Sequence, residues 1–220
     1  MERSFVIIKP DGTTRRRVSA LVLKALMERG YKIRAFREMK VSESLAKLHY
    51  AVHKEKSFFS WLVDFISSAP VLALIFEADD VIQGVRDALG ATFVQKADPS
   101  SLRGKYGIWA GVNIAHASDA PETATKEIEL WSNEGGLVES PDAEEQTKAY
   151  IERYSSGDVD YTMKLRDVVK NAIENSDTSD QVLQSLTELL GMDATGISPE
   201  EISALASVIF EFVKEEVEKE

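Results

Sequence analysis

The segment Phe5-Val6-Ile7-Ile8-Lys9-Pro10-Asp11-Gly12, near the amino end of this 220-residue chain, decides the fold. Its first four residues form an apolar run of strand length, and Pro10 and Gly12 favour a turn directly after it. A lysine at the end of a buried strand projects its ammonium group toward whatever the turn lines, which suits a phosphate group. The alternative is a solvated lysine at the end of a strand.

Apolar periodicity and turn residues extend this pattern through residues 1–131. Strands are predicted at Phe5–Ile8, Lys32–Met39, Val71–Glu77 and Gly107–Gly111, and helices at Val18–Arg29, Glu43–Val52, Asp80–Leu89 and Pro121–Trp131. Strands and helices that alternate in this order predict an α/β (α+β) fold of the ferredoxin-like type. We therefore expect an antiparallel four-stranded sheet packed against helices.

A lone histidine stands among short polar residues in Asn113-Ile114-Ala115-His116-Ala117-Ser118-Asp119. Imidazole is a competent nucleophile at neutral pH because one ring nitrogen attacks while the other donates a hydrogen bond. Glu127 follows in a predicted helix, from which its carboxylate could return to the ring. An isolated histidine is more often a residue near a loop whose hydrogen bonds are satisfied than a catalytic one. Evidence for catalysis therefore has to come from other segments of the chain.

Further segments accompany this histidine in a fixed order. They are Lys9-Pro10-Asp11-Gly12, His49-Tyr50, Phe58-Phe59, Arg86, Gly90-Ala91-Thr92, Leu102-Arg103-Gly104, Asn113 through Asp119, and Glu127-Ile128-Glu129-Leu130-Trp131. In order and approximate spacing they resemble the nucleoside diphosphate kinases, and the resemblance covers about Glu2 to Trp131.

The resemblance implies a kinase that passes the γ-phosphoryl group of ATP or another nucleoside triphosphate to a nucleoside diphosphate. The transfer would follow a ping-pong mechanism through phosphorylated His116. The catalytic residues that carry over are His116, Lys9, Tyr50, Ser118 and Glu127. The nucleotide-binding residues that carry over are Lys9, Phe58, Arg86, Thr92, Arg103 and Asn113, with Phe58 stacking on the base.

Magnesium is the cofactor that this reading implies. Mg²⁺ keeps several waters and needs few protein ligands, so we expect it to arrive with the nucleotide. His49 and His53 lie one helical turn apart, a spacing that can serve a metal ion, but the sequence offers no evident third ligand. We therefore expect no metal site made by the protein itself.

Several residues depart from the family's pattern. Arg15-Arg16-Arg17 and Ser19 stand where the family usually has glycines after its first arginine, and Phe93-Val94 replace an asparagine and a proline. The first change should alter the start of the first helix or the subunit contacts. The second should reshape a loop that packs against neighbouring subunits, because the resemblance implies a homo-oligomer.

Charge divides the chain near Trp131. Residues 1–131 hold 19 Lys and Arg against 16 Asp and Glu, which leaves seven against 21 for residues 132–220. A slightly basic first part suits polyanionic nucleotides. The acidic second part argues against binding of nucleic acid or of an anionic membrane.

The second part reads as a linker at 132–141 followed by an acidic, all-helical extension at 142–220. The linker is rich in Gly, Ser and Pro and lacks an apolar period. Helices are predicted at Asp142–Tyr154, at Val159–Ile173, from Thr178 or Ser179 to Leu190, and from Ser198, with Pro199 and Glu201 completing a capping box. We expect the apolar stripes to form a core, and we see no chemistry in this part.

Two function classes remain open at this point. The first is an active nucleoside diphosphate kinase with domain 1–131. The second is a non-catalytic, kinase-like adaptor whose C-terminal helices bind a protein partner. The chain has no cysteine and no apolar run of about 20 residues, so we expect a cytoplasmic protein without a membrane span.

Overall fold

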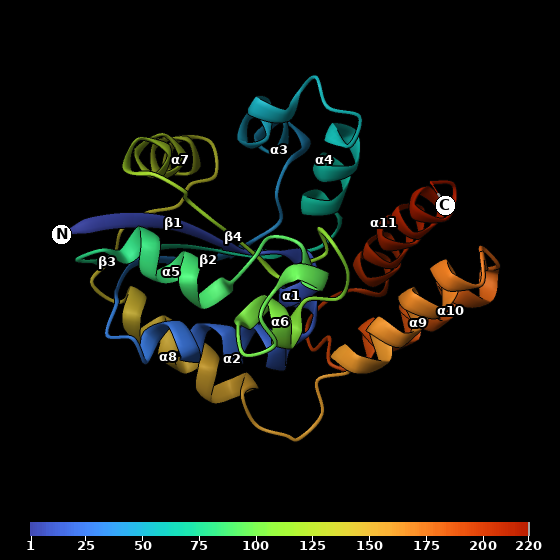
Figure 1. The fold of residues 1–220 in the computed structure, drawn as a ribbon. Helices are drawn as coiled ribbons and strands as arrows, with labels where there is room; N and C mark the ends of the chain where they lie inside the picture. Colours follow the sequence, from blue (N-terminus) through green and yellow to red (C-terminus); the bar gives the residue numbers. More distant parts are fainter. Residues whose placement is uncertain (220) are drawn as a thin grey trace.

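The computed structural model describes residues 1–219 and places one antiparallel sheet at the centre of the molecule (Figure 1). The strands are β1 (Glu2–Ile8), β2 (Lys32–Met39), β3 (Val71–Ala78) and β4 (Ala115–Ala117), in the order β2-β3-β1-β4. Each of the pairs β1·β3, β1·β4 and β2·β3 is antiparallel. The predicted ferredoxin-like, four-stranded antiparallel sheet is confirmed.

The fourth strand lies later in the chain than we predicted. The segment Gly107–Gly111 belongs to a tight loop, closed by a bridge between Trp109 and Val112, and the strand is Ala115–Ala117. Ile108 and Val112 are apolar because they are buried against C-terminal helices rather than in the sheet. The prediction of a strand at Gly107–Gly111 was wrong because the apolar residues there pack against the C-terminal helices and not in the sheet.

Alternate residues of β1 face opposite layers of helices. Val6 and Ile8 pack with α2 (Arg16–Met27) and α5 (Val81–Leu89), whereas Phe5 and Ile7 pack toward α3 (Glu43–His49) and α4 (Phe59–Ser68). Because both faces of the sheet are covered, the whole run Phe5–Ile8 is buried. Figure 1 shows α2 and α5 on one side of the sheet and α3, α4 and α7 (Pro121–Asn133) on the other.

Short helices connect these layers. They are α1 (Pro10–Thr14), α6 (Leu102–Tyr106) and the 3₁₀ turns η1 (Ala51–His53) and η2 (Val94–Lys96). The turn predicted at Pro10 and Gly12 is the beginning of α1, where proline is tolerated because the first amide of a helix needs no partner. The sequence did not predict α4, which extends from Phe59 to Ser68.

The region after residue 142 is all-helical, as predicted. Its helices are α8 (Ala143–Tyr154), α9 (Thr162–Glu174), α10 (Asp180–Gly191) and α11 (Pro199–Val217). The predicted capping box of Ser198 and Glu201 is present at the start of α11. In Figure 1, α8 lies beside α2, and α9, α10 and α11 lie together near α4. Within residues 1–219, no helix is both long enough and apolar enough to cross a membrane.

The helices α9, α10 and α11 share their core with α4 and the loop at Trp109. Buried residues of this cluster include Leu165, Leu186 and Leu205 from the three helices and Phe65 from α4. The predicted role of the apolar stripes as a core is confirmed. In addition, the indole Nε1 of Trp61 in α4 donates to the carbonyl oxygen of Val208 in α11 at 3.0 Å.

Two arginines at the start of α2 also hold the C-terminal region. Arg15 is fully buried, and its Nη1 donates to Oγ1 of Thr162 at 2.8 Å. Arg16 is almost as buried, and its Nε donates to the carbonyl oxygen of Thr195 at 2.9 Å. The arginines that depart from the family's pattern therefore bind another part of the same chain.

Candidate active site

His116 lies on the short strand β4, at the edge of the sheet beside the interior strand β1. It pairs with Ile7 of β1, and its ring lies 6.2 Å from that of Phe5 and 4.7 Å from that of His49, centre to centre. The side chain of His116 is 25 % exposed, so part of the imidazole is accessible from outside. The sheet thus holds the backbone while leaving the imidazole accessible.

Glu127 returns from α7 to the histidine ring, as the sequence suggested. Its Oε1 lies 2.7 Å from Nε2 of His116, and its Oε2 accepts a hydrogen bond from Oγ of Ser118 at 2.6 Å. Ser118 is fully buried, and its Oγ also accepts the amide hydrogen of Phe5 at 3.1 Å. Because an ionised carboxylate only accepts, the proton of the neutral imidazole lies on Nε2 and Nδ1 keeps a free lone pair.

His49 lies against the same ring but is itself engaged. Indole Nε1 of Trp131 donates to its Nδ1 at 3.3 Å, which places the proton of the neutral ring on Nε2. Burial, followed by the nearby His116 and Lys9, holds the pKa of His49 well below its usual value. Ligand atoms of His49, His116 and Glu127 lie within 4.8 Å of one another, close enough to hold a metal ion, whereas His53 is not in this group.

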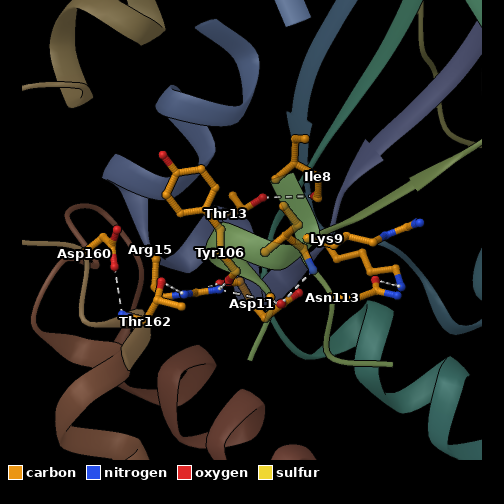
Figure 2. A network of polar contacts seen from close by, with 12 residues as sticks. Ile8, Lys9, Asp11, Thr13, Arg15, Tyr106, Asn113, Asp160 and Thr162 are labelled. Atoms are coloured by element: carbon orange, nitrogen blue, oxygen red, sulfur yellow. Dashed lines mark hydrogen bonds and ion pairs between the residues drawn. The ribbon is translucent and has the colours of Figure 1, made fainter. Parts of the chain in front are cut away.

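Lys9 directly follows β1, and its ammonium group lies inside the molecule rather than in solvent. Nζ donates to Oδ1 of the buried Asn113 at 2.8 Å and lies 3.5 Å from the carbonyl oxygen of Gly111. In Figure 2, Lys9 points toward Asn113, whereas Arg15 points toward Tyr106. Burial and the positive charge of Arg103 lower the pKa of Lys9 to about 8. The ammonium group is therefore charged at neutral pH, but nearby negative charge does not fully offset its burial.

Arg103, which is half-buried, adds a second cation from α6. Its Nη1 and Nη2 donate to the carbonyl oxygens of Gly90 and Ala115, each at 2.8 Å. Burial and the charge of Arg86, which is exposed on α5, lower the pKa of Arg103 to about 10. Burial is the main cause of both lowered pKa values, and a neighbouring cation adds to each of them. An anionic ligand would relieve that repulsion, so the cluster is suited to binding an anion.

The remaining predicted residues lie around this cationic group. Asn113 Nδ2 donates to the carbonyl oxygen of the exposed Thr92 at 2.7 Å. Tyr50 is 7 % exposed, and burial, with Glu127 and Asp11 nearby, raises the pKa of its phenol. Among residues 1–219 the Tyr50 hydroxyl is one of the buried polar atoms without a hydrogen-bond partner, so it has a donor to offer.

Phe58 stands apart from the hydrogen-bonded residues. It lies at the start of α4, and 43 % of its surface is exposed. Its ring lies 5.7 Å from that of His53, centre to centre. An exposed aromatic face at the edge of a polar site is suited to stacking on a planar ligand.

Sequence reasoning missed the contacts that the C-terminal helices make with this site. Arg166 of α9 donates through Nε to the carbonyl oxygen of Gly107 at 2.7 Å and through Nη2 to that of Gly104 at 2.8 Å. Trp61 of α4 packs toward α11. An arginine on a predicted helix gives no local signal of such a partner, since Arg166 and Gly104 are 62 positions apart.

Comparisons with known proteins bear on residues 2–136, which match the family model described as nucleoside diphosphate kinase. A nucleoside diphosphate kinase of Trichormus variabilis is 44% identical over 138 residues, which are 63% of this chain and 92% of that protein. The corresponding enzyme of Methanothermobacter thermautotrophicus is 44% identical over 146 residues, 66% of this chain and 97% of its own.

Solved structures give the same result. A halophilic nucleoside diphosphate kinase from Halobacterium salinarum in complex with CDP is similar with a TM-score of 0.58 and 39% identity, covering 66% of this chain and 97% of that one. The Aquifex aeolicus nucleoside diphosphate kinase is similar with a TM-score of 0.57 and 35% identity, covering 62% and 99%. The matched region contains every candidate site residue, and the C-terminal helices lie beyond the family model.

Proposed function

This chain belongs to the nucleoside diphosphate kinase family, and from that premise we propose how its own residues perform the transfer. The activity is that of a phosphotransferase, which moves the terminal phosphoryl group of a nucleoside triphosphate to a nucleoside diphosphate. No observation favours the non-catalytic adaptor. The assignments of individual residues below are proposals, and they rest mainly on the hydrogen bond between His116 and Glu127.

His116 is proposed as the nucleophile that carries the phosphoryl group. Its Nδ1 attacks the γ-phosphorus, the N–P bond forms, and the bond from phosphorus to the β,γ-bridging oxygen breaks, releasing the nucleoside diphosphate. A second nucleoside diphosphate then attacks the phosphohistidine and restores the free imidazole. The hydrogen bond between Nε2 and Glu127 supports this role because it orients the ring and leaves Nδ1 unprotonated. Ser118 holds the carboxylate of Glu127 in place.

Lys9, Arg86 and Arg103 are proposed to bind the phosphates and to stabilise the transition state. Charge develops on the oxygens of the transferring group, and positioned cations in a site of low dielectric stabilise it. The lowered pKa values of Lys9 and Arg103 support this role, since burial and a neighbouring cation both disfavour their charge until an anion binds. The unpartnered hydroxyl of Tyr50 supplies a neutral donor to the same oxygens.

Asn113, Thr92 and Phe58 are proposed to hold the rest of the nucleotide. The hydrogen bond from Asn113 to Thr92 joins two loops beside Lys9, where the ribose and phosphates would lie. Phe58 would stack on the base through its exposed face. Stacking reads no base edge, so purines and pyrimidines should both be accepted.

Magnesium is proposed to enter with the nucleotide, as part of the substrate. The side chains closest to the phosphate position are cations, which cannot bind Mg²⁺, and the carboxylate of Glu127 is already engaged by two donors. Oxygen ligands for Mg²⁺ would therefore come from the phosphates and from water. The metal would add positive charge along the phosphates, and the protein would supply the positioning.

Several wider features are also proposals. We propose that the chain divides into a kinase domain at 1–131, a linker at 132–141 and a helical extension at 142–220. Assembly into a homo-oligomer, a cytoplasmic location and a protein partner for the C-terminal helices are expectations from the sequence alone. The proposed boundary follows from the charge and composition of the sequence. In the structure, the extension packs against α4 and shares a hydrophobic core with it.

The proposed role of His116 is tested with γ-labelled ATP and magnesium. The protein should acquire an acid-labile, alkali-stable label, which a nucleoside diphosphate then removes. His116→Ala should abolish the label, whereas His53→Ala, a substitution of another histidine outside the cluster, should retain it. Equal labelling of wild type and His116→Ala would overturn the assignment.

A further inference from the structure

The end of α6 is held by a residue from the C-terminal helices. The guanidinium group of Arg166 donates to the carbonyl oxygens of Gly107 at 2.7 Å, Gly104 at 2.8 Å and Arg103 at 3.3 Å. A guanidinium presents several donors in a rigid fork, so one side chain can satisfy several carbonyls at a helix end. Its positive charge also favours the C-terminal end of a helix.

The helix α6 depends on such contacts. It has only five residues, and helices of this length do not persist without tertiary packing. Its first turn is fixed by Ser101, whose Oγ accepts from the amide of Gly104 at 3.1 Å. Its last turn is fixed by Arg166, so the two ends are held by different parts of the chain.

The position of α6 determines the position of the Arg103 guanidinium. That side chain reaches from the first turn of α6 to the carbonyl oxygens of Gly90 and Ala115. Ala115 directly precedes His116, so Arg103 lies at the base of the strand that carries the nucleophile. A shift of α6 would move the Arg103 guanidinium relative to Gly90 and to the strand that carries His116.

We propose that Arg166 is a positioning residue of the phosphate site, which acts through the backbone of α6 to fix the guanidinium of Arg103. The proposal rests on the proposed function, in which Arg103 contacts the phosphates. It makes the C-terminal helices part of the catalytic unit through a residue that acts on the site by way of the backbone. The core that these helices share with Phe65 and Val112 holds Arg166 in place.

A purely structural role for Arg166 makes a different prediction. If Arg166 only attached α9 to the rest of the molecule, its replacement would lower the thermal unfolding midpoint and leave the folded enzyme's kinetics unchanged. A positioning role predicts weaker nucleotide binding and slower phosphorylation in protein that is still folded. Kinetics and unfolding therefore have to be measured on the same variants.

The experiment compares Arg166→Gln and Arg166→Lys with Lys170→Gln, an exposed control on the same helix. The readouts are kcat/KM and Kd for ATP, the labelling of His116 and the thermal unfolding midpoint. We expect kcat/KM of Arg166→Gln to fall by up to about 100-fold, as misplacement of a site by a distant change can do. Arg166→Lys should be intermediate because a single ammonium nitrogen keeps the charge but cannot reproduce the fork in which Nε contacts Gly107 and Nη2 contacts Gly104. Lys170→Gln should match wild type.

A double-mutant cycle tests the route through Arg103. In an Arg103→Gln background, Arg166→Gln should have little further effect on kcat/KM, because the group that it positions is already gone. Additive effects, or wild-type Kd and kcat/KM in folded Arg166→Gln, would overturn the proposal. If Arg166→Gln does not fold, wild-type kinetics of Arg166→Lys would overturn it instead. Absence of a label on the wild-type protein would contradict only the role of His116, since Kd reports on Arg166 independently.

Discussion

Nε2 of His116 lies 2.7 Å from Oε1 of Glu127, a residue eleven positions further along the chain. The two residues lie on different elements, the strand β4 and the helix α7. Because Ser118 donates to the other oxygen of the same carboxylate, Glu127 cannot rotate freely. The orientation of the His116 ring is therefore fixed by a carboxylate that is itself held in place.

Replacing Glu127 by glutamine should slow phosphorylation of His116. A hydrogen bond to a charged group contributes about 1.5–3 kcal/mol, which corresponds to a loss of about 10- to 100-fold in rate. Single-turnover labelling with γ-labelled ATP measures this step directly. Glu129→Gln changes an exposed carboxylate of the same helix and should keep the wild-type rate, so an equal effect of both substitutions would contradict the prediction.

Nucleotide capture should weaken as the pH rises above 8. Burial and the charge of Arg103 lower the pKa of Lys9 to about 8, so this ammonium group loses its charge well before an ordinary lysine does. The pKa of Tyr50 is raised and that of His49 is lowered, so neither should titrate in this window. The profile of kcat/KM, which reports the free enzyme, should show a descending limb near this pH. Lys9→Arg should move that limb upward, and an unchanged limb would exclude Lys9 as its source.

The same pKa has the opposite consequence for folding. Between the folded value of about 8 and the ordinary value of 10.5, the unfolded chain binds more protons at Lys9 than the folded chain does. The contribution of Lys9 to the free energy of unfolding therefore increases as the pH rises through this window. Urea unfolding of wild type and Lys9→Met at pH 7.5 and about 10 would measure the difference. We expect the free energy of unfolding of Lys9→Met to exceed that of wild type by more at pH 7.5 than at about pH 10.

Replacing Leu205 by alanine should destabilise the whole molecule, because its side chain is fully buried in the core shared by α4, α9, α10 and α11. Large-to-small changes of this kind cost about 2–5 kcal/mol. Met192→Ala, at a position that is 61% exposed, should cost far less. Equilibrium unfolding in urea, monitored by tryptophan fluorescence, compares the two. A separate, early transition confined to the C-terminal helices would contradict the shared core.

The capping box at Ser198 gives a smaller, local prediction. Oγ of Ser198 accepts the amide hydrogen of Glu201 at 3.2 Å, and the carboxylate of Glu201 accepts that of Ser198 at 3.0 Å. Ser198→Ala should lower the free energy of unfolding by about 0.5–2 kcal/mol. Ser207→Ala lies on the exposed face of the same helix and should be neutral or slightly stabilising, because alanine is the better helix former. The free energy of unfolding from urea titrations checks both.

Local features of the fold were predictable from the sequence. The apolar run Phe5–Ile8 is a central strand, and the cap residue Ser198 begins α11, because both signals depend on neighbouring residues alone. The sheet and its antiparallel order followed from the succession of such segments. The strand Ala115–Ala117 escaped detection because three residues are too few to show a period.

The site was predictable where motif residues carry the chemistry, and it was not where distant elements support it. The proximity of Glu127 to His116 was suggested by the short separation along the chain. By contrast, the polar contact of Trp61 with Val208 joins residues 147 positions apart, and no local pattern indicates it. The core shared with α4 and the bonds of Arg166 to α6 lead us to expect that removal of residues 140–220 would impair transfer, although no candidate site residue lies in that region.

The two buried arginines at the start of α2 limit how this chain could be recombined with others. Grafting residues 1–131 onto an unrelated C-terminal segment would remove the partners Thr162 and Thr195 and leave guanidinium donors of Arg15 and Arg16 unsatisfied inside the protein. Each such donor costs about 1–3 kcal/mol, and more when it is charged. A viable chimaera would therefore have to replace both arginines together with the graft.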